Sequence, residues 1–97
     1  MRIGSKSRNL RNLIQKAILM LVRLAVKILY AYYRRESTVL TNLAAYEKDD
    51  DALAAAVCRA RLETYAICMD IVRSECREID IWSTVRSSLV VMGLDIE

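Results

Sequence analysis

Residues 10–33 read LRNLIQKAILMLVRLAVKILYAYY, and this stretch decides which fold the chain can adopt. Apolar side chains recur along it at spacings of 4, 3, 4, 3, 4 and 3, at Leu10, Ile14, Ala17, Leu21, Leu24, Ile28 and Ala31. This spacing is typical of one face of an α-helix. A second apolar row beside the first, formed by Ile18, Ala25, Leu29 and Tyr32, widens the face to about half of the circumference. Because that arc is broader than a two-stranded coiled-coil seam, we expect it to be buried against more than one neighbour.

The first helix is expected over about residues 7–47, with Ser7 or Ser5 as its N-cap. Val39, Leu43 and Tyr46 keep the apolar phase to the end of this range. The weak point is the segment 34–38, where Arg35 falls on the apolar row and where serine and threonine are poor helix formers. We therefore expect a kink or a break there.

An acidic turn follows at 48–51, Lys-Asp-Asp-Asp, and it predicts the start of a second helix. One aspartate can cap the helix, and the others face the positive end of its dipole. The second helix is expected over about 51–92, with Gly93 as its C-terminal cap. Between Ile79 and Trp82 the apolar pattern shifts by one step, which makes this the place where the helix would bend or end early.

The chain is therefore predicted to be one all-α domain, 1–97, built as a long helical hairpin that is kinked or broken near 34–38. Ordering a residue costs roughly 1.5 kcal/mol, and a single seam between two helices cannot offset that cost over the whole chain. Either the first helix folds back on itself as a third element, or copies of the chain assemble into a homo-oligomeric helical bundle; we favour the bundle, with a dimer as its order. The seam expected to form the core or the contact between subunits comprises Leu21, Leu24, Ile28, Leu62, Tyr65, Met69, Val72, Ile79 and Trp82.

Composition excludes several classes of protein. With two glycines and no proline among 97 residues, the chain lacks the turn formers of a sandwich or barrel. With no histidine, it lacks the commonest proton shuttle and metal ligand. The adjacent carboxylates Asp49, Asp50 and Asp51 suit helix capping better than metal binding. We expect no enzyme, no catalytic residue, no metal, no cofactor and no small-molecule substrate.

Three cysteines, Cys58, Cys68 and Cys76, are spaced 10 and 8 residues apart. This spacing matches no zinc or redox motif, and one helix would hold the three thiols too far apart to pair. Free thiols favour a reducing compartment, so a cytoplasmic location is expected.

Charge is divided unevenly along the chain. Residues 1–35 contain nine lysines and arginines and no acid, whereas residues 36–97 contain six cations and twelve acids, a net charge of −6. On a helical wheel Lys16, Arg23, Lys27 and Arg34 fall within about 40° of one another. The candidate binding residues for an anionic partner are these four cations together with Arg8, Arg11 and Tyr30.

This pattern predicts a small binding protein: an adaptor, inhibitor or regulator whose basic first helix contacts an acidic protein surface or a phosphate-bearing ligand, including nucleic acid. A solvated face, or a face between subunits, would also carry such cations.

A peripheral membrane protein is the alternative. Residues 17–33 are almost entirely apolar, but Arg23 and Lys27 interrupt them, and each such charge costs roughly 2.5–3.5 kcal/mol at the centre of a spanning helix. A spanning helix is therefore not expected. A basic amphipathic helix of this kind could instead lie on the surface of an anionic membrane.

Overall fold

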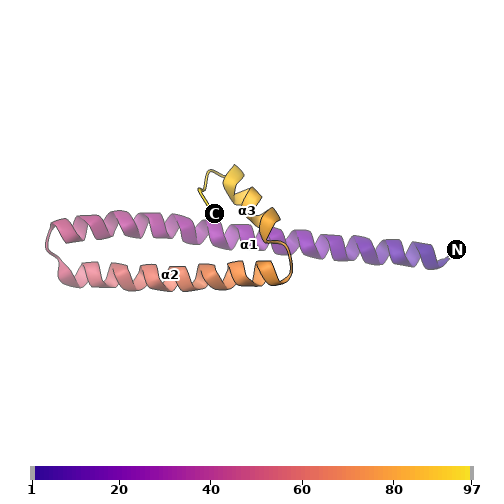
Figure 1. The fold of residues 1–97 in the computed structure, drawn as a ribbon, viewed down its shortest axis with the longest axis horizontal. Coiled ribbons are helices and arrows are strands. Elements are labelled where there is room, and N and C mark those ends of the chain that lie inside the picture. Colours follow the sequence, from indigo (N-terminus) through magenta and orange to yellow (C-terminus); the bar gives the residue numbers. More distant parts are fainter. Residues whose placement is uncertain (1, 97) are drawn as a thin grey trace.

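Three α-helices make up the protein, in a computed structural model that describes residues 2–96, with side chains from Arg8 onward. They are α1 (Arg2–Lys48), α2 (Ala52–Glu78) and α3 (Trp82–Val91), and the residues described contain no strand. The expected all-helical class is confirmed. Helix α2 runs back along α1, and α3 lies against α1 near the end of α2 (Figure 1). The resulting shape is long and narrow, 74 × 22 × 17 Å.

Helix α1 continues through the segment where a break was expected, so that expectation was wrong. The hydroxyl of Thr38 in this segment donates a hydrogen bond to the Arg34 carbonyl at 3.2 Å, and that of Thr41 just beyond it donates to the Ser37 carbonyl at 3.1 Å. The guanidinium of Arg35 stays exposed and lies 6.0 Å from the centre of the Tyr32 ring. Because Val39 is also buried, packing outweighs the weak local helix propensity.

The other predicted boundaries need two corrections. Helix α1 begins at Arg2 rather than near residue 7, so Ser5 and Ser7 lie inside the helix and neither is its N-cap; their side chains are outside those described. The second predicted helix, about 51–92, is two helices, because α2 ends at Glu78 and α3 begins at Trp82, at the step where the apolar pattern predicted a bend or an early end.

Each helix ends in a residue with a left-handed backbone. Asp50, Asp80 and Gly93 have φ angles of 55°, 61° and 93°. In each case the next residue donates its N–H to the carbonyl five positions back, over 2.9 Å at the end of α1, 2.8 Å at the end of α2 and 3.1 Å at the end of α3. These are Schellman motifs, which satisfy the last carbonyls of a helix and turn the chain out of it. The predicted C-terminal cap at Gly93 is confirmed.

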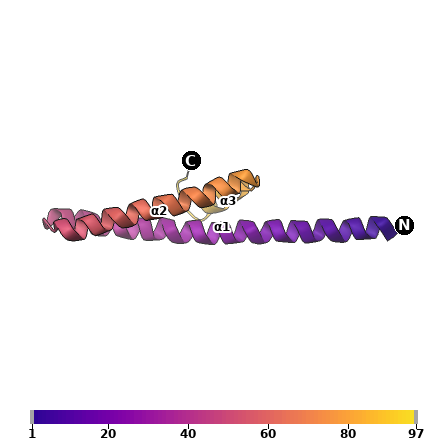
Figure 2. The same cartoon turned by 90° about the horizontal axis from the view of Figure 1, so that it is seen from below.

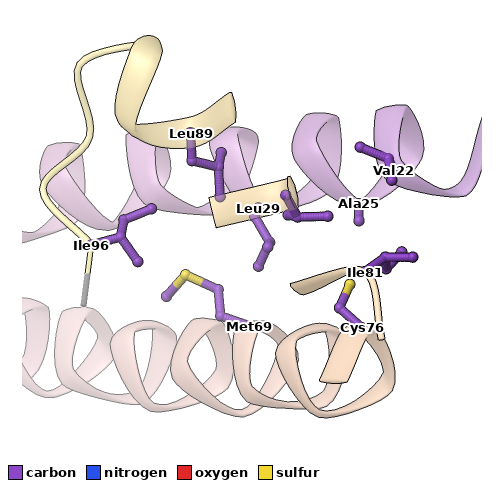
Figure 3. Close-up of a cluster of buried hydrophobic side chains, with 9 residues drawn as sticks. Val22, Ala25, Leu29, Met69, Cys76, Ile81, Leu89 and Ile96 are labelled. Carbon is purple, nitrogen blue, oxygen red and sulfur yellow. The ribbon is translucent and has the colours of Figure 1, made fainter. Parts of the chain in front are cut away.

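The core lies where the three helices meet (Figure 3). Among residues 8–96 no polar or charged residue is buried, so the core is held by apolar packing alone. Two of its members, Cys76 and Ile81, flank the turn that ends α2, which ties that turn to the core. The buried cluster consists of Val22, Ala25, Leu29, Met69, Cys76, Ile81, Val85, Leu89 and Ile96.

Within one chain, the predicted seam is only partly covered. Met69 is buried, and Ile28, Leu62, Tyr65, Val72 and Trp82 are half-buried, whereas Leu21, Leu24 and Ile79 are exposed. On α1 the second apolar row supplies the core, through Ala25 and Leu29. The buried side of α1 also includes Val22 and the half-buried Val26, on the side of Ala25 and Leu29 away from the first row, so the first row lies at the edge of the core.

Replacing Leu29 with alanine should destabilise the fold strongly, because this side chain is completely buried among the three helices. A Leu→Ala change at such a position costs about 2–5 kcal/mol. The same change at Leu40, which is 49% exposed on the same helix, should cost less than about 1 kcal/mol. Urea unfolding followed by circular dichroism measures both values. Equal losses for the two variants would show that Leu29 does not lie in the core.

Candidate functional site

The N-terminal part of α1 projects beyond the other two helices (Figures 1 and 2). We call residues 8–21 of α1 the arm. Every residue of the arm is exposed, whereas further along α1 side chains such as Val22, Ala25 and Leu29 are buried. The arm exists because α2 ends at Glu78, so that within the described part of the chain α2 does not run on beside residues 8–21 of α1.

The arm carries an uncovered apolar surface. Leu13 is 64% exposed and Met20 68% exposed, although a leucine or methionine is ordinarily among the more buried residue types. Ala17, Met20, Leu21 and Leu24 line an open depression together with Arg23 and Lys27. The exposed large apolar side chains of the arm are those of Leu10, Leu13, Ile14, Ile18, Leu19, Met20 and Leu21.

This apolar surface continues onto the main body of the protein. A second depression is lined by Leu21, Leu24 and Ile28 of α1 together with residues from the end of α2, among them Ile71 and Ile79. The apolar side of the arm therefore faces the same way as the side of α1 on which α2 packs.

We call Lys16, Arg23, Lys27 and Arg34 the cationic stripe. All four residues are exposed, and they lie in one line along α1 because they are spaced 7, 4 and 7 residues apart. Among the described side chains, the ion pairs join Arg59 to Glu47 at 2.8 Å and Arg73 to Asp70 at 3.3 Å, so neither uses the stripe. The stripe is a run of positive charge that no described acid of the same chain neutralises.

The remaining predicted binding residues lie elsewhere on α1. At about 100° per residue, Arg8 and Arg11 are roughly 80° and 140° away from the stripe, so they do not extend it in a straight line. Tyr30 packs against the core, and the guanidinium of Arg34 lies 5.8 Å from the centre of its ring. The Tyr30 ring is therefore engaged within the fold and offers no open platform for stacking.

A second exposed apolar surface lies on α2, and sequence reasoning missed it. Ile67 and Ile71 are 60% and 58% exposed, on the side of the helix opposite the buried Cys58, Met69 and Cys76. Its signal is present in the sequence as another row at spacings of 4, 3, 4, 3 and 4, on the far side of the helix from the row that forms the core. We call this row the outward face of α2, and it consists of Leu53, Val57, Ala60, Thr64, Ile67 and Ile71.

The acidic turn acts as a helix cap. The Asp51 carboxylate accepts a hydrogen bond from the Ala54 N–H at 3.1 Å, as expected of an N-cap residue. Within the described part of the chain, no three side chains of the metal-ligating types come together in a possible metal site. In the same residues, no helix has a stretch long and apolar enough to cross a membrane.

The three cysteines are free and all lie on α2. Cys58 and Cys76 are buried and Cys68 is half-buried. Burial raises the pKa of the Cys76 thiol, and the neighbouring charge of Glu75 adds to this effect. Cys76 therefore behaves as a small apolar core residue.

No protein-family model matches the chain, and no curated protein or solved structure shows a significant similarity to it.

The folded protein should react with a thiol reagent at one cysteine before the other two. At pH 8, Cys68 should be modified first, because Cys58 and Cys76 become accessible only when the helices open. The raised pKa of Cys76 keeps this thiol protonated and slows it further. The measurement is a time course with a chromogenic disulfide, and the protein unfolded in guanidinium serves as the control in which all three react at once. Three equally fast thiols in the folded protein would contradict this core.

Proposed function

We propose that this protein is a non-enzymatic binding protein, an adaptor, inhibitor or regulator, that contacts an anionic partner through the cationic stripe. We further propose that α1 and α2 act as a helical hairpin and that copies of the hairpin assemble into a homo-oligomeric bundle. The partner is either an acidic protein surface or a phosphate-bearing ligand such as nucleic acid.

The observation that carries the proposal is the unneutralised charge of the stripe. Its four cations are exposed, the first 35 residues contain no acid, and the chain's twelve acids all come later. A surface that served only solubility would be expected to mix charges of both signs. A row of one sign instead produces a field that attracts a partner of the opposite charge.

The dimensions of the stripe suit an extended partner. From Lys16 to Arg34 it spans 18 residues of straight helix, which is about 27 Å. Lysine and arginine bind phosphate and carboxylate groups without reading a base sequence. An interaction of this kind weakens as salt rises, because each contact with a phosphate releases a counterion.

Changing Lys16, Arg23, Lys27 and Arg34 together to glutamine should weaken binding to an anionic polymer by at least about tenfold at low salt. Two probes distinguish the classes of partner: a labelled single-stranded oligonucleotide and a labelled polyglutamate peptide, each followed by fluorescence anisotropy. The matched control changes Lys48, Arg59, Arg61 and Arg77 to glutamine, which removes the same charge from other parts of the surface. Equal affinities for the two variants, or a wild-type affinity that does not change with salt, would overturn the proposal.

A second candidate function is favoured by the exposure of the arm. The leucines and isoleucines of the arm are exposed within one chain. The arm therefore has one apolar side and one basic side, as does a helix that lies on an anionic membrane. In this alternative, the lipid surface and not a second copy covers Leu10, Ile14 and Leu21.

The membrane alternative predicts that the protein co-sediments with vesicles containing phosphatidylserine and not with vesicles of phosphatidylcholine alone. The double change Leu10→Gln and Ile14→Gln should then abolish sedimentation, since it removes apolar area from the arm. The control, Val90→Gln with Val91→Gln, alters exposed residues at the end of α3 and should leave sedimentation unchanged. Failure of the wild type to sediment with either vesicle eliminates this alternative.

A further inference from the structure

The chain has two uncovered apolar surfaces, and they carry opposite charge. The arm has only cations among its charged residues, Arg8, Arg11 and Lys16. The outward face of α2 has exposed acids around Ile67 and Ile71, among them Asp70 and Glu75. We propose that in a dimer the arm of each copy lies on the C-terminal half of the outward face of α2 in the other copy. This inference rests on the proposed assembly and names the surfaces that form it.

The acids around the outward face of α2 are available for such a contact. Ile67, Asp70, Ile71, Ser74 and Glu75 line one open depression. The arginines of this part of α2 are occupied within the chain: Arg73 pairs with Asp70, and Arg77 lies 5.6 Å from the centre of the Trp82 ring. From Glu63 to Glu78 the charge of α2 is net negative, because the four acids Glu63, Asp70, Glu75 and Glu78 outnumber the two arginines, and Asp70 shares its charge with Arg73.

The arm is long enough to cover the end of the outward face. Leu10 and Leu21 lie 11 residues apart on the arm, about 17 Å, whereas Ile67 and Ile71 lie four residues apart on α2, about 6 Å, so the arm can cover both. In each copy the apolar side of the arm faces the same way as the side of α1 that holds α2, as the shared depression around Leu21 and Ile79 shows.

A two-fold axis perpendicular to the plane of α1 and α2 is the symmetry that brings these surfaces together. Rotation by a half turn places the arm of the second copy beneath α2 of the first, with its apolar side facing α2, and the reverse contact forms at the same time. Each α2 then lies between its own α1 and the arm of the other copy. The arm runs parallel to the α2 that it covers, because α1 and α2 are antiparallel within one chain (Figure 1).

When two parallel helices pack face to face, one edge of the first apolar face meets the opposite edge of the second. The charged residues of the arm and of α2 lie at edges that meet in this way. On the helical wheel Arg11 lies at one edge of the apolar side of the arm, with Arg8 beyond it. Glu63 and Asp70 lie at the opposite edge of the outward face of α2, so Arg11 faces the two acids, whereas Arg8, about 150° from the apolar row, adds to the positive charge of the arm. The cationic stripe lies about 120° from the apolar row of the arm, so it remains on the outside of the dimer.

A second copy explains more of the surface than a membrane does. Lipid would cover the arm and leave Ile67 and Ile71 exposed, whereas the reciprocal contact covers both surfaces at once. Pairing of one arm with another arm would bring like charges together, since the arm contains no acid.

Exchanging the charges tests the contact in the full-length chain. One variant carries Arg8→Glu and Arg11→Glu, and the other carries Glu63→Lys and Asp70→Lys. Each alone should be monomeric by sedimentation velocity under conditions in which the wild type is a dimer, because arm and α2 then repel each other. An equimolar mixture should form a heterodimer, since both of its contacts again join opposite charges. Circular dichroism of each variant confirms that the helices are retained.

The outcomes separate this inference from the proposed function. A dimeric wild type whose variants both remain dimeric, or whose mixture stays monomeric, overturns the arm-to-α2 contact and leaves the proposed assembly in place. A monomeric wild type overturns both, and sedimentation of that monomer with phosphatidylserine vesicles would assign the arm to lipid. Binding of the anionic probes is judged separately, on the wild type and the glutamine variant of the cationic stripe, because Arg8→Glu and Arg11→Glu also change the charge of α1.

Discussion

The difference in length between α1 and α2 is the constraint from which the other features follow. Helix α1 has 47 residues, about 70 Å, and α2 has 27, about 40 Å, so one cannot cover the other. Apolar surface left in water costs roughly 25 cal/mol per Å², and the arm retains a row of leucines and isoleucines that α2 cannot reach. The arm is uncovered because α2 is shorter than α1, and the proposals for what covers the arm follow from this difference in length.

The mismatch is fixed by local chemistry at the end of α2. The left-handed backbone of Asp80 and the hydrogen bond from the Ile81 N–H to the Cys76 carbonyl end the helix there. The side chains of Cys76 and Ile81 are buried in the core, which stabilises the turn. Helix α3 then packs on the flank of α1 instead of prolonging α2. A longer α2 would have covered the arm, whereas this arrangement covers the middle of α1 from two sides.

Periodicity was sufficient to predict an all-helical chain, the turn after Lys48 and the cap at Gly93, because these depend on residues close in sequence. It failed at 34–38, where the burial of Val39 outweighs the poor helix propensity of its neighbours. It could not show which of two adjacent apolar rows on α1 would be buried, because that choice depends on where α3 packs. The cationic stripe was visible in the sequence because its four residues share one side of one helix. The outward face of α2 was overlooked because the row that forms the core was taken as the only apolar side of that helix.

Hydrogen exchange of the arm, measured at several protein concentrations, tests most directly whether a second copy covers this segment. If it does, the backbone amides of residues 8–21 should exchange more slowly as concentration rises, together with those around Ile67 and Ile71, while the core amides near Leu29 stay protected throughout. Rapid exchange of the arm at every concentration would contradict the account, because it would mean that no second copy covers the apolar side of α1.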